Sequence, residues 1–169
     1  MKVLDVHDGT ENNLTANFPD AEIEHVSILD IEAWPKENKY DIVFCFHSLP
    51  LIQAGKVPDT VQIMADLLAP GGELWASTPS LEWCSRHILS TNPQPYAHTL
   101  IYGHSEKQYK SGYTVFWLRG LMESAGLVIR QAKHDTYYLS ASDGQQLKAL
   151  QNIVIGWNYE PLVNNHPAT

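Results

Sequence analysis

A histidine that closes a hydrophobic run is the first residue whose type and position suit chemistry. The segment from Asp41 to His47 (DIVFCFH) is apolar except at its two ends, as expected for a strand buried on both faces of a sheet. An imidazole at the end of such a strand opens into the crevice where open α/β sheets bind ligands, and its ordinary pKa suits proton transfer near neutral pH. His47 is therefore a candidate base, with a packed neutral histidine as the alternative.

A carboxylate stands near the end of an earlier strand signal. Lys2 to Val6 is apolar and β-rich apart from Lys2 and Asp5, and a polar run with Gly9 follows. Ligands of open α/β sheets bind at the carboxyl ends of the strands, so Asp5 is expected near the same crevice as His47. The alternative is an acid that caps the loop after the strand.

Composition excludes several classes of function. The 169 residues, 44% of them hydrophobic, predict one globular domain spanning residues 1–169. A formal charge of −8 with scattered lysines and arginines argues against nucleic-acid binding. No segment has the roughly 18 apolar residues of a membrane helix, and no signal peptide is recognised. Two cysteines, Cys45 and Cys84, suit a reducing cytoplasm, and the eight histidines form no zinc-binding pattern, so no metal is predicted.

Strand and helix signals alternate, which predicts an α/β fold with a mostly parallel sheet flanked by helices and an antiparallel end. Apolar periodicity predicts a helix that starts near Pro58 and runs to Leu68, and another over 114–125 with Gly126 as its C-terminal cap. A short helix over 10–17 is also expected. Further strands are expected over 22–28, 73–77, 128–140 and 151–157.

Three segments in this order resemble the class I S-adenosylmethionine (SAM) dependent methyltransferases. Residues 30–52 (DIEAWPKENKYDIVFCFHSLPLI) are similar to the family's run of an acid, a proline and an aromatic-Asp pair before its fourth strand. Residues 67–80 (LLAPGGELWASTPS) resemble its LKPGG turn into the fifth strand, and residues 118–127 (LRGLMESAGL) its LLEEAGF helix. The resemblance covers about 60% of the chain and implies a Rossmann-like methyltransferase fold.

The front of the chain departs from the family pattern. VLDVHDGT is similar to the family's first strand and glycine-rich loop, VLDLGCGTG, but Gly9 is the glycine that remains. The family loop needs glycines because its backbone turns sharply and approaches the methionine part of the cofactor. The side chain of His7 is expected either to point toward the cofactor pocket or to force the loop onto another path. Asp8 places a second side chain in the same loop.

One strand-helix unit of the family fold is missing, because only 19 residues separate VLDVHDGT from DIEAWP. In one alternative, Lys2 to Val6 is the central first strand and an outer unit is absent. In the other, the same residues are the second strand and the glycine loop is absent altogether. The first is favoured, since losing an edge unit leaves the sheet continuous.

The resemblance implies SAM as the cofactor, held by Asp5, Gly9 and Asp30, with Asp30 facing the adenine amino group. The alternative for Asp30 is a turn residue before Ile31. Residues 93–113 lie where the family places a segment over its substrate, so His104 joins His47 as a candidate catalytic base. The aromatic and histidine side chains that would line this acceptor site are Tyr96, His98, Tyr102, His104, Tyr109 and Tyr113, unless the segment is an ordinary surface loop.

Two functions from different classes follow. The first is methyl transfer to a small-molecule acceptor, which asks the protein mainly to align the acceptor with the methyl group. The second is a catalytically inactive methyltransferase-fold protein with a structural or assembly role, whose partner is another protein or a second copy of the chain. The lost glycines and Leu51, which replaces the family's second histidine, favour the second function.

Overall fold

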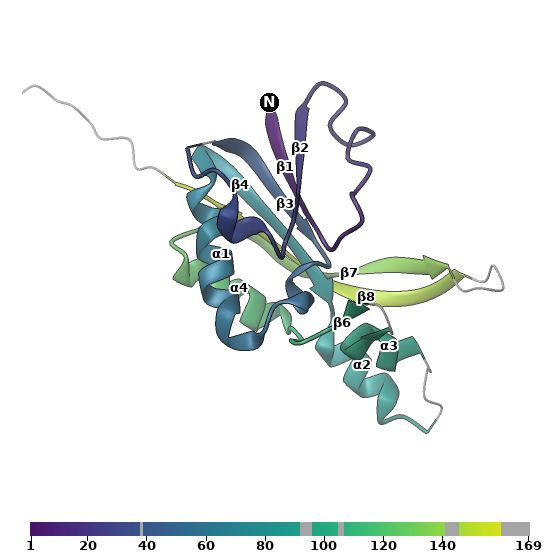
Figure 1. The fold of residues 1–169 in the computed structure, drawn as a ribbon. Helices are drawn as coiled ribbons and strands as arrows, with labels where there is room; N and C mark the ends of the chain where they lie inside the picture. The colour runs from purple at the N-terminus through teal and green to yellow at the C-terminus, as the bar shows by residue number, and fades with distance from the viewer. Residues whose placement is uncertain (38, 92–95, 105–106, 141–145, 160–169) are drawn as a thin grey trace, which may run out of the picture.

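The computed structural model describes residues 1–37, 39–91, 96–104, 107–140 and 146–159. Its main sheet has six strands in the order β2-β1-β3-β4-β8-β7 (Figure 1). The first four are mutually parallel, and β8 and β7 add an antiparallel end. These strands are β1 (Lys2–His7), β2 (Glu22–Ser27), β3 (Tyr40–Phe46), β4 (Leu68–Pro79), β7 (Val128–Ser140) and β8 (Gln146–Trp157).

The chain has the expected mostly parallel sheet with an antiparallel end. β1 pairs with β2 on one side and with β3 on the other, so the sheet is continuous. If Lys2 to Val6 is the central first strand of the family fold, β1 lies between β2 and β3 without any rearrangement. If the same residues are the second strand, β1 must instead close the gap left by a lost central strand. β3 is central, as Asp41 to His47 predicts.

Helices cover one face of the sheet. The two long ones are α1 (Val57–Asp66) and α4 (Val115–Ser124), which lie along the same face (Figure 1). Met64 of α1 and Met122 of α4 are fully buried in the core against the strands, because the apolar residues of both helices recur at helical spacing. Gly126 has a φ of +82° just after α4, as expected for a helix that ends in a left-handed residue.

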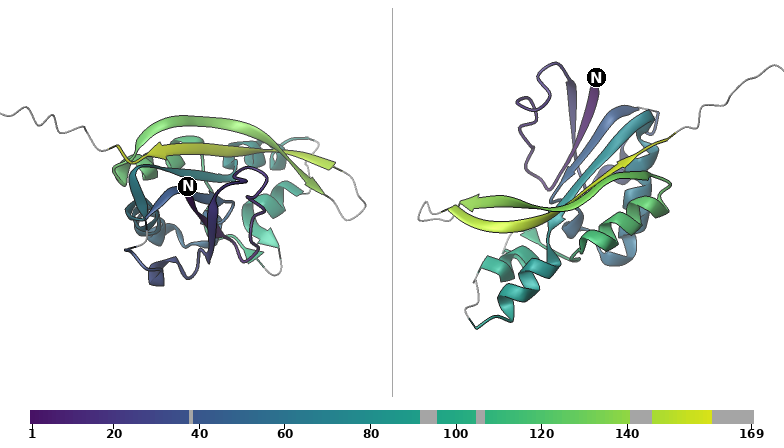
Figure 2. Two further views of the ribbon diagram at one scale, coloured as in Figure 1. Left: turned by 90° about the horizontal axis from the view of Figure 1, so that it is seen from above. Right: turned by 180° about the vertical axis from the view of Figure 1, so that it is seen from behind.

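The opposite face is only partly covered. Residues 10–21 pack Leu14 and Phe18 against β1 and β3, but no helix among the described residues lies over β4 and β8 on this side (Figure 2). Phe44 and Phe46 of β3 are half-buried there, so the expectation of a strand buried on both faces is wrong for these two positions. Below, "the open face" means this side of β3, β4, β8 and β7.

The short helix expected over 10–17 is absent; the chain forms turns there instead. The three Asn and two Thr residues of this segment are poor helix formers, and an eight-residue helix gains little stability without tertiary packing. Asn12 binds Asp5 through both its backbone and its side chain, which fixes a non-helical conformation.

A second, smaller core lies beyond the carboxyl ends of the strands. It joins α2 (Leu81–Ile88) and α3 (Tyr96–Tyr102) to the far end of the β7–β8 hairpin through Cys84, Ala97, Leu100 and Ala149 (Figure 2). Cys45, by contrast, belongs to the main core. A short hairpin of β5 (Gly103–His104) and β6 (Lys107–Gln108) follows α3. No helix in the described ranges is both long and apolar enough to cross a membrane.

Candidate functional site

The loops that follow β1, β2 and β3 meet at one edge of the sheet, the carboxyl edge of its parallel strands (Figure 1). Ser48 ties two of these loops together, since its hydroxyl donates to the backbone oxygen of Val6 over 2.9 Å. Ligands of open α/β sheets bind at this edge. The predicted residues Gly9, Asp30 and His47 lie along it.

The loop after β1 satisfies its own hydrogen-bonding groups. Gly9 has a φ of +102°, which explains the glycine, and its N–H donates to His7 Nδ1 over 3.0 Å. The N–H of Thr10 donates to Asp8 Oδ1 over 3.2 Å. Asp8 also pairs with Lys107 of β6, whose ammonium lies 2.9 Å from Oδ1. The backbone donors of the loop therefore face its own side chains, and His7 turns onto its own loop.

Asp5 supports the loop from beneath. Its side chain is fully buried and accepts hydrogen bonds from the Asn12 N–H at 2.8 Å and the Asn12 side-chain amide at 2.7 Å. His25 Nδ1 on β2 lies 3.1 Å from the same carboxylate. These contacts favour the capping interpretation of Asp5, because they leave little of the carboxylate for a ligand.

Asp30 lies in the turn after β2, just before the 3-10 helix Ile31–Ala33. Its side chain is exposed and makes no capping hydrogen bond, while its backbone closes the turn through Ser27 and Ala33. A contact between Asp30 and an adenine amino group stays a prediction.

His47 has a strained backbone and a well-packed ring. Its φ of +52° is left-handed, a conformation that side-chain-bearing residues adopt mainly at turns and functional sites. The ring stacks on Phe46 at 4.1 Å between centroids and meets Tyr137 edge-on at 4.8 Å. Nε2 lies 3.1 Å from Gln151 Oε1. Because that oxygen can only accept, Nε2 carries the proton and Nδ1 keeps its lone pair.

Burial lowers the pKa of His47 from 6.5 to about 4, although the hydrogen bond to Gln151 and the charge of Asp8 act in the opposite direction. His47 is therefore neutral at physiological pH, as a base must be before it accepts a proton. A conjugate acid with so low a pKa makes it a weak base.

Sequence reasoning missed the partners of His47. Gln151 and Tyr137 come from β8 and β7, about a hundred residues along the chain, and only the antiparallel pairing brings them to β3. The predicted His104 lies in β5, where its backbone pairs with Lys107, and its side chain falls outside the described residues. Tyr113 is fully buried, so it is a core residue and does not line an acceptor site.

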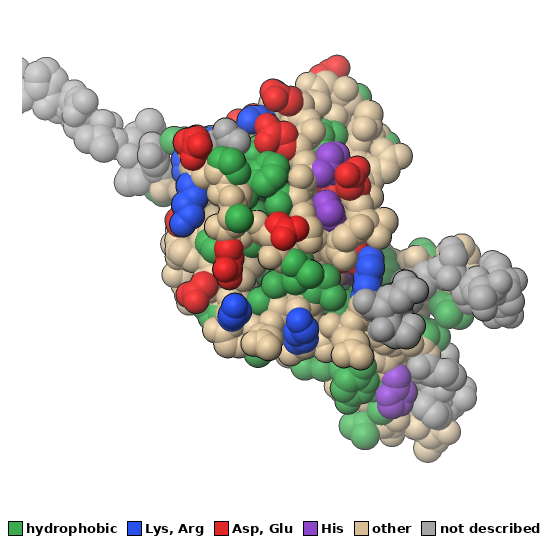
Figure 3. All heavy atoms as spheres, in the orientation of Figure 1, with side chains coloured by type: hydrophobic (Ala, Val, Ile, Leu, Met, Phe, Trp, Pro, Cys, Tyr) green, Lys and Arg blue, Asp and Glu red, His purple; other side chains and the backbone are tan. Residues whose placement is uncertain are grey.

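A cavity of about 260 Å³ lies at the same edge, between the loop after β2 and the loop after β3. Its lining is about half apolar, with Ile28, Ile31 and Ile52, and half polar, with charged side chains of both signs, among them Glu32 and Lys56. Acidic and basic side chains are also interspersed over the face that Figure 3 shows. A planar group that carries polar substituents suits such a mixed lining.

The comparisons with solved structures agree with this architecture. An O-methyltransferase family protein from Burkholderia thailandensis matches 94% of this chain at 16% identity with a TM-score of 0.54. A SAM-dependent methyltransferase from Methanosarcina mazei matches 95% at 13% identity, also at 0.54. The 1,6-didemethyltoxoflavin-N1-methyltransferase of Burkholderia thailandensis, solved with bound S-adenosylhomocysteine, matches 94% at 13% identity and 0.59.

The fold is that of the class I SAM-dependent methyltransferases. The chain spans 43% of the O-methyltransferase family protein, 93% of the archaeal protein and 71% of the toxoflavin enzyme. No protein-family model matches the sequence, and a search of curated proteins found no match. At identities of this size the likeness concerns the methyltransferase fold alone.

The residues after β1 do not fit the methionine part of SAM. In a methyltransferase fold this loop has to offer its backbone to the cofactor, but here the N–H groups of Gly9 and Thr10 are already bonded to His7 and Asp8. Lys107 further closes the loop by binding both Asp8 and Thr10.

Proposed function

We propose that this chain is a methyltransferase-fold protein that has lost SAM-dependent catalysis and has a structural or assembly role. The observation that supports this proposal is the self-satisfied loop after β1. Binding of SAM in the manner of the fold would require Gly9 and Thr10 to give up their bonds to His7 and Asp8, and the ion pair between Asp8 and Lys107 to open. Each broken bond reduces the affinity that the ligand could gain.

Exposed aromatic side chains support the assembly role. Phe116 at the start of α4 is 78% exposed, and the neighbouring Trp117 is 40% exposed while stacking on Tyr113 at 4.9 Å. Large aromatic residues in contact with solvent are typical of surfaces that bind other proteins. Sedimentation velocity over a range of protein concentrations tests for a homo-oligomer, with Phe116→Ser as the variant that should dissociate it.

A second candidate is methyl transfer to a small-molecule acceptor with SAM as cofactor. The cavity of about 260 Å³ between the loops after β2 and β3 favours it, because its mixed apolar and polar lining at the carboxyl edge suits a purine-sized ring with polar substituents. In this candidate His47, neutral and with a free lone pair on Nδ1, is the group in position to take a proton from an acceptor.

Calorimetric titration with SAM and with S-adenosylhomocysteine separates the two candidates. We expect no dissociation constant tighter than about 100 μM, equivalent to roughly −5.5 kcal/mol. The double variant His7→Gly, Asp8→Ala is expected to gain affinity if the rest of the crevice is intact, because it frees the two backbone donors. Asp20→Ala, an exposed acid elsewhere, serves as the control. A low-micromolar constant for the native chain would contradict the proposal and favour methyl transfer.

A further inference from the structure

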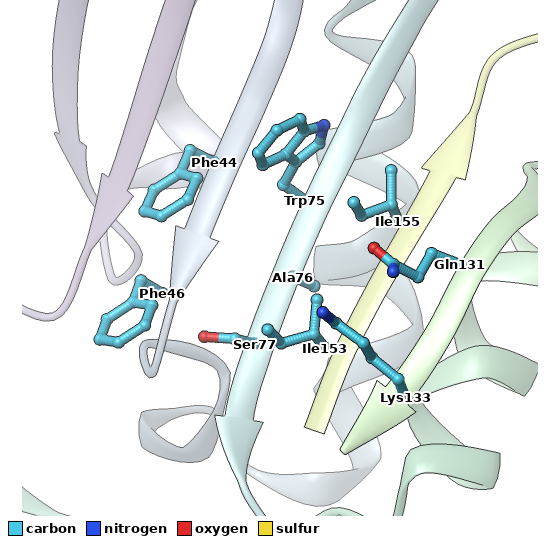
Figure 4. Close-up of a pocket in the computed structure, with 9 residues that line it drawn as sticks. All are labelled: Phe44, Phe46, Trp75, Ala76, Ser77, Gln131, Lys133, Ile153 and Ile155. Atoms are coloured by element: carbon cyan, nitrogen blue, oxygen red, sulfur yellow. The ribbon is translucent and has the colours of Figure 1, made fainter. Parts of the chain in front are cut away.

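The open face carries a second hollow, which shares no lining residue with the cavity at the carboxyl edge. It is a cavity of about 320 Å³ over β3, β4, β8 and β7 (Figure 4). Two rows of side chains cross the sheet beneath it, set by the strand register. One row is Phe44, Trp75, Ile155 and Gln131, and the other is Phe46, Ser77, Ile153 and Lys133.

The hollow exists because one position in the second row is small. Ser77 stands between Phe46 on one neighbouring strand and Ile153 on the other, with Trp75 two residues away on the same face. Side chains two residues apart, and those directly opposite on paired strands, are the ones that touch on a sheet face. A serine among three large apolar neighbours therefore leaves a depression with aromatic and aliphatic walls.

Ser77 is also polar and without a partner. The residue is 7% exposed, and its hydroxyl oxygen has no hydrogen-bond partner among the described residues. A buried polar group left unsatisfied costs about 1–3 kcal/mol, so such groups usually point to an absent partner. Rotation about the Cα–Cβ bond is enough to aim a serine hydroxyl at a new partner.

The rim of the hollow supplies charge. Lys133 on β7 extends over the depression in Figure 4, with the amide of Gln131 beside it. Its ammonium lies 3.2 Å from Asp135, but both side chains are 45% exposed. An ion pair so exposed to solvent is worth little, so Lys133 remains free to bind an anion at the rim.

We propose that this hollow binds a planar aromatic acid. The ring system would lie against Phe46 and Trp75, and the carboxylate would accept hydrogen bonds from Ser77 Oγ and Lys133 Nζ. The walls are mostly apolar with a few polar groups, which is the usual composition of a small-molecule site. An apolar helix laid over this face would cover Ser77 without supplying an acceptor, because its backbone carbonyls bond within the helix, which is why we favour a small ligand.

The first measurement is a calorimetric titration of the full chain with 2-naphthoate and with its neutral analogue 2-naphthamide. We expect one molecule of 2-naphthoate per chain and weaker binding of the amide, because the amide cannot attract Lys133 as an ion does. Addition of SAM should leave this binding unchanged, since the hollow lies on the open face and not at the carboxyl edge. The inference therefore does not depend on whether the chain binds SAM.

Two substitutions of Ser77 separate the contribution of the shape of the hollow to 2-naphthoate binding from the contribution of the serine hydroxyl. Ser77→Leu fills the hollow and should weaken 2-naphthoate binding at least about tenfold, whereas Ser77→Ala keeps the space and should weaken it about two- to tenfold through the lost hydroxyl. Lys133→Gln should bring the affinity for 2-naphthoate close to that for the amide. Tyr138→Ala removes an aromatic ring that is 63% exposed on the same strand and should change nothing.

Each variant is checked for folding by its urea transition, so that a loss of binding is not confused with unfolding. Binding of 2-naphthoate that survives Ser77→Leu in a folded protein would overturn the proposal. The absence of any heat of binding at millimolar 2-naphthoate would also overturn the proposal. Sedimentation that shows a dimer dissociated by Ser77→Leu would replace the small ligand by a second copy of the chain.

Discussion

The half-buried histidine of the carboxyl edge makes the stability of the whole domain depend on pH. The pKa of His47 falls from 6.5 in the unfolded chain to about 4 in the folded one, because burial penalises the imidazolium. Between these values the unfolded state takes up a proton that the folded state refuses. Stability is therefore fully present above about pH 6.5 and is lost as the pH falls toward about 4, by at most about 3 kcal/mol.

The test compares the native chain with His47→Gln by urea denaturation at several pH values from about 7.5 to about 4.5. The variant should be less stable than the native chain at the higher pH, because it loses the stacking on Phe46. That difference should shrink by about 2 kcal/mol at the lower pH, since glutamine does not titrate. Taking the difference between the two proteins removes the contributions of the carboxylates that they share.

His98→Gln is the matched control, because His98 is an exposed histidine on α3. The free energy of unfolding of His98→Gln should change with pH in the same way as that of the native chain. A constant difference between the native chain and His47→Gln would refute the argument, since it would mean that His47 titrates alike in the folded and unfolded states. The same result would restore His47 as a base of ordinary strength.

Three further outcomes are expected. Asp5→Ala should lower the free energy of unfolding by about 1–3 kcal/mol in urea, because the partly buried N–H of Asn12 loses its acceptor; Asp5→Asn, which keeps one oxygen, should cost less. Met122→Ala should cost about 2–5 kcal/mol by leaving a cavity under α4, whereas an alanine at the exposed Phe116 should change stability by less than about 0.5 kcal/mol. Wherever SAM binding is measurable, Asp30→Ala should weaken it about five- to 150-fold through a lost hydrogen bond to the adenine amino group, and an unchanged constant would remove Asp30 from the site.

Sequence patterns predicted the elements whose signal is local. The apolar run before His47 gave the central strand, and the helical spacing of Leu118 and Met122 gave α4, because burial on a strand or a helix leaves a regular period in the sequence. Positions 128–140 form β7 over the predicted range. Each of these elements could be predicted because its pattern of apolar residues depends only on its own segment and on the one surface against which it packs.

What the patterns missed depends on three-dimensional detail: which face of a strand is covered, which rotamer a side chain adopts, and how two strands are in register. An apolar run cannot tell whether helices cover both faces of its strand, so the half-buried state of Phe44 and Phe46 was unforeseen. The capping of Gly9 by His7 depends on a rotamer, and the contact of His47 with Gln151 depends on the register of β8. Neither quantity has a signature in residue spacing. The helix wrongly predicted over 10–17 has a comparable cause, since the buried Asp5 holds Asn12 in a non-helical conformation.

The two cysteines lie in separate cores, which gives the molecule a built-in pair of probes. Burial raises the pKa of both thiols to about 12, so neither forms the reactive thiolate while its surroundings stay folded. An alkylating reagent would therefore modify Cys84 when the α2–α3 unit opens and Cys45 only when the main sheet does. Equal labelling rates would mean that the domain unfolds cooperatively as a whole. Faster labelling of Cys84 would mean that the smaller core unfolds before the main sheet.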